Sequence, residues 1–203
     1  MRKGLKRIEA TVVDFPDVGK FPVSVEFLGW QSVLIFSIGR SCHYHGFLIE
    51  LATKELELRR KKALVHLNNT MLLQFILDWC KLFGSTKDNE VHWRNLYLRR
   101  RSNDRDNKIR GKINEKIKNY IKLNSGIKNK YEAVEGALID ARNRYAAHLQ
   151  PSDIPKLAML NDAYRVACTY SSIVCCQDKV IMPEIADRLE FDREEIEVII
   201  SNG

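Results

Sequence analysis

The sequence predicts an all-α protein in which a bundle of four or five main helices follows a small extended or hairpin element. From about residue 47 to residue 180, apolar side chains recur at steps of three and four, which is the period of amphipathic helices. Residues 8–27 instead show the alternation of a strand. We therefore divide the chain into an extended arm or hairpin at 1–28, a helical bundle at 29–182 and an acidic helical tail at 183–203.

The first part of the chain leaves two alternatives open. A turn signal at Pro16–Gly19 separates two alternating runs, which predicts either a hairpin or an extended arm. From Gly29 onward the pattern becomes helical, with Gly39 and Gly46 as candidate breaks. Residues 30–39 also fit a strand, so their structure stays undecided between helix and strand.

Two helices are expected between residues 47 and 83. Leu51, Leu58 and Val65 repeat at steps of seven, which predicts a single amphipathic helix over residues 47–67. Residues 69–83 are apolar nearly all round and are followed by Gly84, a common helix stop. A segment of this kind is expected to form the central helix of the bundle.

The composition is that of a soluble globular protein, with 45% hydrophobic and 29% charged residues among 203. Its net charge of +7 favours a polyanionic partner. The five cysteines are odd in number and lack the spacing of a disulfide framework, so we expect a reducing, cytoplasmic environment. We find no signal peptide, no run of roughly 18 apolar residues and no phosphate-binding glycine loop, and we expect no membrane, metal or cofactor.

Basic charge is concentrated in residues 94–130, which hold thirteen Lys or Arg and three acids. This segment carries +10, whereas the rest of the chain sums to −3. A charged face is usually only solvated, but an excess of this size is better explained by a surface that faces phosphates. An amphipathic helix is expected over residues 109–121. The candidate RNA-binding residues are Arg99, Arg100, Arg101, Arg105, Lys108, Arg110 and Lys112.

A helix over residues 129–151 carries the most specific pattern. Asn129 and Glu132 have the spacing of a capping box, and Pro151 is a stop. Its apolar stripe consists of Val134, Leu138, Ala141, Tyr145 and Leu149. Beside the stripe stand Arg142, Asn143 and His148.

Two arginines of this helix differ in their expected partners. Arg144 has Asp140 four residues before it, the favourable order for a surface ion pair. Arg142 has no acid at three or four residues in either direction, so it is available to a partner from elsewhere.

The sequence Arg142-Asn143, four residues, then His148 resembles the motif of HEPN domains, and the resemblance covers about residues 67–180. It implies a helical bundle, a homodimer and a metal-independent endoribonuclease with a toxin or defence role. His148 would be the general acid or base, and Arg142 would clamp the phosphate. Asn143 would orient the phosphate or the histidine. HEPN toxins paired with a nucleotidyltransferase antitoxin have a Tyr two residues after the histidine. This chain has Gln150 there, so that mode of control gains no support.

Helix geometry places the two main motif residues apart. Six residues at about 100° each separate Arg142 and His148 by about 120° around the helix and about 9 Å along it. A single copy would therefore make a poor pincer for a phosphate. A twofold homodimer that brings two such helices together would solve the problem.

Four further residues are second-rank candidates. Asp78 interrupts the apolar run 69–83 and must reach either a solvent strip or a partner, for which Arg142 is a candidate. Glu90, His92 and Trp93 form a polar and aromatic group. Trp93 would either stack on a base or close the end of the bundle.

Two functions of other classes compete with RNA cleavage. One is a non-catalytic helical module that binds RNA or a partner protein. The other is a purely structural interaction domain whose basic face is incidental. Salt-dependent RNA binding without cleavage favours the first, and lack of any affinity for RNA favours the second.

Overall fold

The computed structural model describes residues 10–15, 18–53, 58–84, 91–97, 103–148 and 157–174, so the predicted tail at 183–203 lies outside the described residues. The fold is all-α, as predicted. The strands are β1 (Ala10–Phe15) and β2 (Gly19–Ser24). The helices are α1 (Val25–Ala52), α2 (Leu58–Phe83), α3 (Asp104–Asn124), α4 (Tyr131–His148) and α5 (Leu157–Val174), with short 3-10 turns η1 (Trp93–Asn95) and η2 (Lys128–Lys130).

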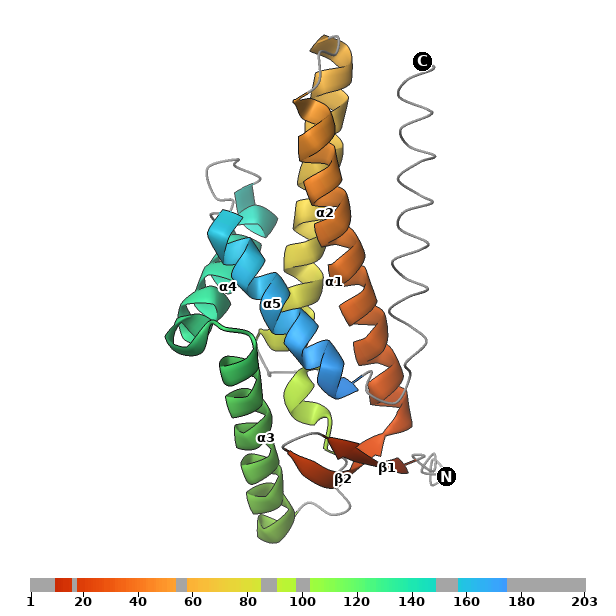
Figure 1. Ribbon diagram of the computed structural model, residues 1–203, viewed down its shortest axis with the longest axis vertical. Coiled ribbons are helices and arrows are strands. Elements are labelled where there is room, and N and C mark those ends of the chain that lie inside the picture. The colour runs from red at the N-terminus through yellow and green to blue at the C-terminus, as the bar shows by residue number, and fades with distance from the viewer. Residues whose placement is uncertain are drawn as a thin grey trace.

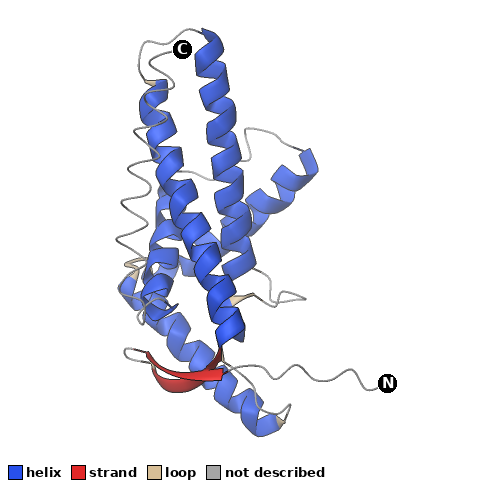
Figure 2. Ribbon diagram, turned by 90° about the vertical axis from the view of Figure 1, so that its right-hand side faces the viewer, coloured by secondary structure: helices blue, strands red, loops and turns tan. Residues whose placement is uncertain are grey.

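The helices α1 and α2 form a long antiparallel hairpin that runs along most of the molecule (Figure 1). Both α4 and α5 pack against its lower part, and α3 lies at the lower end near the strands. In the two views the upper end of the hairpin extends beyond α4 and α5 (Figures 1 and 2). This end has a small apolar cluster of its own, made of Phe47, Leu48, Leu51 and Leu64 with Met71 against it.

Of the hairpin and the extended arm that the sequence left open, the structure has the hairpin, and its second strand is shorter than the alternation indicated. The strands β1 and β2 pair antiparallel, from Ala10 opposite Ser24 to Phe15 opposite Gly19. Gly19 has a φ of +103°, which favours glycine at this turn. Ser24 ends the strand because its side chain accepts a hydrogen bond from Phe27 N at 3.3 Å and so caps α1.

Helix α1 corrects the strand alternative for residues 30–39. It runs unbroken from Val25 to Ala52 through Gly39 and Gly46. Its buried residues include Gln31, Ile35 and Ile38, spaced at four and three, so the segment packs with helical periodicity.

The single helix predicted for residues 47–67 was also wrong. The helix α1 ends at Ala52 and α2 begins at Leu58, so Leu51 and Leu58 belong to different helices. Leu51 is buried, whereas Leu58 and Val65 are 69% and 53% exposed. The heptad spacing of Leu51, Leu58 and Val65 thus arises by chance, because it spans two helices. Leu51 is buried in a cluster that also contains Leu64 of α2.

The second half of α2 is the centre of the bundle, as predicted. Phe75, Ile76, Trp79 and Leu82 are almost completely buried in the main core. The indole Nε1 of Trp79 donates to the backbone oxygen of Ala163 on α5 at 2.9 Å. Burying a Trp this fully requires a partner for its N–H, and α5 provides it.

A buried chain of hydrogen bonds connects α5, α1 and the segment before η1. Tyr170 on α5 donates its hydroxyl to Gln31 Oε1 at 2.7 Å. Gln31 on α1 in turn donates from Nε2 to the backbone oxygen of His92 at 3.2 Å. All three residues are fully buried, so each bond satisfies a polar group that would otherwise be costly to bury.

Asp78 is buried in the helix pair, not on a solvent strip, and Arg142 is not its partner. Its Oδ2 accepts hydrogen bonds from Ser37 on α1 and Gln74 on α2, both at 2.6 Å. Its Oδ1 pairs with Lys81 Nζ at 3.1 Å. The sequence indicated that a carboxylate at this position needs a partner. Its partners are Gln74 and Lys81 on the same helix and Ser37 on α1.

No helix in the described part of the chain is long and apolar enough to cross a membrane.

We predict that Asp78→Ala destabilises the fold by about 1–3 kcal/mol, because it leaves partly buried groups of Ser37 and Gln74 without their acceptor. Asp140→Ala is the matched control, since Asp140 is exposed and its ion pair with Arg144 is long, at 3.8 Å. This substitution should lower the free energy of unfolding by no more than about 0.5 kcal/mol. Urea unfolding monitored by circular dichroism measures both. Equal effects of the two substitutions would contradict the structural role of Asp78.

Candidate functional site

Helix α4 holds the motif residues on a rigid support. Its inner face buries Val134, Leu138 and Ala141, and Cys80 on α2 donates its thiol to the backbone oxygen of Leu138 at 3.5 Å. The predicted capping box is replaced by another contact. Asn129 lies within the turn η2, and Glu132 pairs with two lysines of α3.

Arg142 and Asn143 form a pair at the surface of α4. The guanidinium of Arg142 donates from Nε and Nη2 to Asn143 Oδ1 at 3.2 and 3.0 Å. Arg142 is half-buried and Asn143 exposed, and within the described residues Arg142 takes part in no ion pair. Arg144 pairs with Asp140 as predicted. Arg142 is therefore oriented by a neutral neighbour, and among the described residues no group accepts from its Nη1, which can donate to an anion.

His148 is the last residue of α4, and its side chain lies outside the described part of the structure. The helix is continuous from Arg142 to His148, so the offset of about 120° around the axis and about 9 Å along it applies. Gln150 also lies outside the described residues.

The basic segment contributes a groove at the start of α3. This surface groove has a volume of about 470 Å³ and is lined by Asp104, Arg105, Lys108, Ile109 and Lys112. Three of the seven candidate RNA-binding residues thus lie together, whereas Arg99, Arg100 and Arg101 fall outside the described residues. The start of α3 is at the lower end of the molecule and the end of α4 is higher up (Figure 1). The groove and the motif are therefore separate surfaces.

Other basic residues of this segment have structural partners. Arg110 donates from Nε to the backbone oxygen of Arg94 at 3.1 Å and from Nη2 to the side chain of Asn95. Lys118 and Lys122 pair with Glu132 at 3.1 and 2.6 Å, which fixes the end of α3 to the start of α4. The lysine-rich face is consequently available to a ligand mainly in the first half of α3.

His92 is a buried structural histidine. Its Nδ1 accepts from the backbone N–H of Arg94 at 3.1 Å, and its Nε2 is 2.8 Å from the backbone oxygen of Gly84. Because Nδ1 accepts, Nε2 carries the proton and donates, and the ring is neutral. Burial lowers the pKa of His92 from 6.5 to about 4. This histidine is unsuited to proton transfer near neutral pH.

Trp93 is 1% exposed, so it closes the end of the bundle and does not offer a stacking face. The guanidinium of Arg94 lies 5.3 Å from the centre of its ring. Glu90, the third member of this group, lies outside the described residues.

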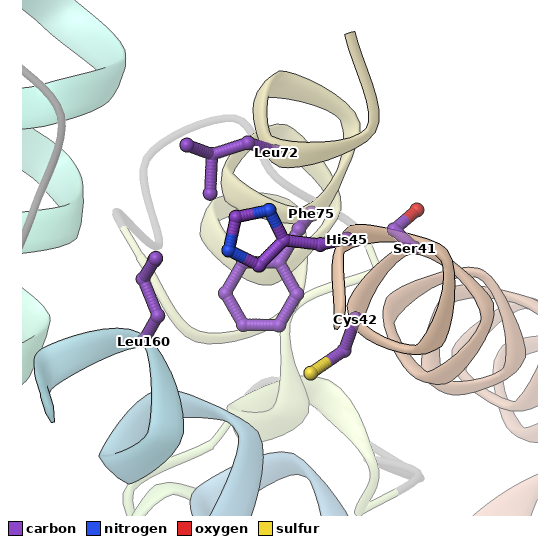
Figure 3. Close-up of a pocket in the computed structure, with 6 residues that line it drawn as sticks. All are labelled: Ser41, Cys42, His45, Leu72, Phe75 and Leu160. Carbon is purple, nitrogen blue, oxygen red and sulfur yellow. The ribbon is translucent and has the colours of Figure 1, made fainter. Parts of the chain in front are cut away.

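A small apolar pocket between α1, α2 and α5 is too small for a substrate (Figure 3). Its volume is about 10 Å³, room for about one water molecule. It is lined by Ser41, Cys42, His45, Leu72, Phe75 and Leu160.

The chemical groups of this space are not activated. His45 Nδ1 lies 2.7 Å from Asn68 Oδ1. Burial raises the pKa of Cys42 to about 11, so its thiol stays protonated and is no nucleophile at neutral pH. In the ranges that the structure describes, no three His, Cys, Asp or Glu side chains form a group that could hold a metal ion.

Sequence reasoning missed two residues, Glu135 and Arg94. Glu135 precedes Arg142 by seven residues, so both lie on the same edge of α4. Arg94, at the start of the basic segment, lies near enough to Glu135 to influence its pKa. The spacing of seven was a readable signal, but the position of Arg94 depends on the packing of η1.

The chain matches none of the family models, curated proteins or solved structures with which it was compared. Functional assignment therefore depends on the residues and their geometry.

We predict that the protein loses stability as the pH falls from 6.5 to about 4, because the unfolded state then binds a proton that neutral, buried His92 does not. The contribution of His92 is complete above pH 6.5 and decreases by on the order of 1 kcal/mol per pH unit below it. Urea unfolding between pH 4.5 and 7.5 measures this. His92→Gln should flatten the dependence, whereas His66→Gln, at an exposed site on α2, should leave it unchanged. Equal slopes for all three proteins would contradict the assignment to His92.

Proposed function

We propose that this protein is a metal-independent endoribonuclease of the HEPN type, with its site on α4. The observation that carries the proposal is Arg142: a half-buried guanidinium on a rigid helix, oriented by Asn143 and without an ion pair among the described residues. An arginine held in this way matches the planar geometry of a phosphate.

RNA needs little from such an enzyme, because its own 2′-hydroxyl is the nucleophile. Arg142 would neutralise the charge that grows on the phosphate oxygens, and Asn143 would keep the guanidinium in place. His148 would transfer a proton, a role that an imidazole with a pKa near neutrality can fill. Cleavage would then leave a 2′,3′-cyclic phosphate and a 5′-hydroxyl.

The proposed site is completed by a second copy of the chain. Arg142 and His148 lie about 120° apart on one helix, so they cannot both face one phosphate from the same protomer. In a twofold dimer, Arg142 of one protomer would face His148 of its partner, and each dimer would have two such sites.

The groove at the start of α3 would bind the RNA backbone away from the cleavage point. It offers Arg105, Lys108 and Lys112 and lies at the other end of α3 from the turn that leads to α4. Since α3 alone is about 30 Å long, RNA that reaches both surfaces must be many nucleotides long. Contacts of this kind are made to phosphates and give affinity without sequence preference.

We expect the purified protein to cut labelled single-stranded RNA in EDTA. Arg142→Ala and His148→Ala should each lower the rate at least about 100-fold, because each removes a group that acts in the transition state. Arg144→Ala is the control, since Arg144 is exposed and already paired with Asp140. RNA left uncut by the wild type, although bound, would instead favour the non-catalytic binding module.

Subunit mixing tests whether the site is shared. Neither Arg142→Ala nor His148→Ala should be active alone, but a refolded equal mixture should recover up to about a quarter of the wild-type activity. Half of the dimers would be mixed, and each of these would have one of its two sites intact. If the mixture stays inactive, the two residues do not act across a dimer interface.

We predict that RNA binding weakens steeply with salt, with a log–log slope of about 0.7 for each phosphate contacted. Replacing Arg105, Lys108 and Lys112 together by Gln should lower both affinity and slope, whatever the RNA sequence. The matched control replaces Arg59, Lys61 and Lys62, three exposed cations at the start of α2, at the opposite end of the molecule (Figure 1). Fluorescence anisotropy at several NaCl concentrations measures this, and equal losses for the two triple variants would rule out a specific role for the groove.

A further inference from the structure

Glu135 and Arg142 share one edge of α4. Seven residues are 20° short of two helical turns, so the two side chains leave the helix in nearly the same direction, about 10.5 Å apart along it. Both are half-buried. Cys80 on α2 donates its thiol to the backbone oxygen of Leu138, which lies between them along α4, and burial raises the pKa of this thiol to about 11. This edge of α4 therefore faces α2 with an acid and a base two turns apart.

Glu135 is a half-buried carboxylate that takes part in no ion pair among the described residues. Burial raises its pKa above the usual 4.5, and Arg94, Lys118 and Lys122 oppose that effect, while Glu132 adds to it. Lys118 and Lys122 are held by Glu132. Arg94 is thus the remaining cation whose charge acts on Glu135, and it forms no ion pair among the described residues.

The guanidinium of Arg94 forms no ion pair with Glu135 among the described residues, although its charge lowers the pKa of that carboxyl. It lies over the ring of Trp93 at 5.3 Å, and the backbone oxygen of the same residue accepts hydrogen bonds from Arg110 and Asn114 at 3.1 and 3.2 Å. A cation and an anion that interact at a distance, both partly exposed, leave space for a polar group between them.

A buried hydroxyl without a partner lies beside this pair. Tyr131 is 1% exposed, and within the described residues its hydroxyl has no hydrogen-bond partner. Burial raises the pKa of this hydroxyl. The charge of Glu135 raises it further, and the charge of Arg94 lowers it. Because most buried hydroxyls have a partner, this one is a candidate to bind a polar atom of a ligand.

From these contacts we infer that Glu135 is the general base of the proposed ribonuclease, in the same protomer as Arg142 and with Arg94 as a second phosphate-binding cation. The inference rests on the proposed function and adds the proton acceptor that His148 and Arg142 leave unassigned. A carboxylate, an imidazole and arginines are together sufficient for cleavage of RNA by its 2′-hydroxyl.

The step balances with these residues alone. Glu135 takes the proton of the 2′-hydroxyl while the 2′-oxygen forms its bond to phosphorus. The bond from phosphorus to the 5′-oxygen breaks, and that oxygen takes a proton from the imidazolium of His148, contributed by the partner protomer. The products are a 2′,3′-cyclic phosphate and a 5′-hydroxyl, with Glu135 protonated and His148 neutral.

The test compares two carboxylates three residues apart on α4. Glu135→Gln should lower kcat about 100-fold or more with little change in KM, because a general base acts only in the transition state. It should also remove the acidic limb of the pH–rate profile, which in the wild type is expected above pH 4.5. Glu132→Gln is the control: Glu132 pairs with Lys118 and Lys122 and should keep both the rate and the limb. Glu135→Asp, which retains a carboxylate, should keep the limb at a reduced rate.

Each outcome decides between the alternatives. If the wild type cuts RNA and Glu135→Gln keeps both its rate and its acidic limb, Glu135 is not the base, while the proposed function stands. If the wild type leaves RNA uncut from pH 4.5 to 8.5, the proposed function fails and this inference with it. Circular dichroism shows whether Glu135→Gln is folded. If it is not, the profile of Glu135→Asp decides, and a profile without an acidic limb overturns the inference.

Discussion

The bundle depends on a line of buried hydrogen bonds that runs from Tyr170 through Gln31 and His92 to Gly84. The bonds join α5, α1 and the end of α2 to the segment that begins η1. The ring of His92 must remain neutral to accept from Arg94 N while donating to the backbone oxygen of Gly84. Removing one member would leave its neighbours buried without partners, which costs more than the lost bond itself.

The position of η1 follows from this line, and the site follows from η1. His92 fixes the backbone of the next two residues, so the guanidinium of Arg94 lies over the ring of Trp93. Arg110 and Asn114 on α3 hold the same segment through the backbone oxygen of Arg94. A residue that has no role in proton transfer can thus decide where a cation lies.

Much of the fold was predictable because long helices leave a periodic pattern in the sequence. Residues 69–83 predicted the second half of α2. The alternation around Pro16 left a hairpin and an extended arm open, of which the structure has the hairpin of β1 and β2. The boundary between α1 and α2 was not predictable from spacing, because Leu51 and Leu58 keep a heptad register across two separate helices. The same spacing fits one continuous helix and two helices joined by a chain reversal. Which of the two forms depends on contacts between residues distant in sequence.

The candidate site divides in the same way. Arg142, Asn143 and the ion pair of Arg144 could be read from one helix, since their relations are local. The partners of Asp78 include Ser37, 41 residues away, and this contact has no signature in the sequence. Glu135 could have been found from its spacing to Arg142, but Arg94 could not, because the segment from η1 reaches α4 only through packing.

We expect the upper end of the α1–α2 hairpin to behave as a separate unit of stability. It extends beyond the helices that cover the rest of α1 and α2, and its cluster contains four buried residues against the much larger main core (Figures 1 and 2). With so few apolar contacts, its backbone should open without unfolding of the bundle, and its amides should exchange with solvent long before those near Trp79. The two ends of one helix therefore belong to different cooperative units, and a ligand bound to the tip would order it without moving the site on α4.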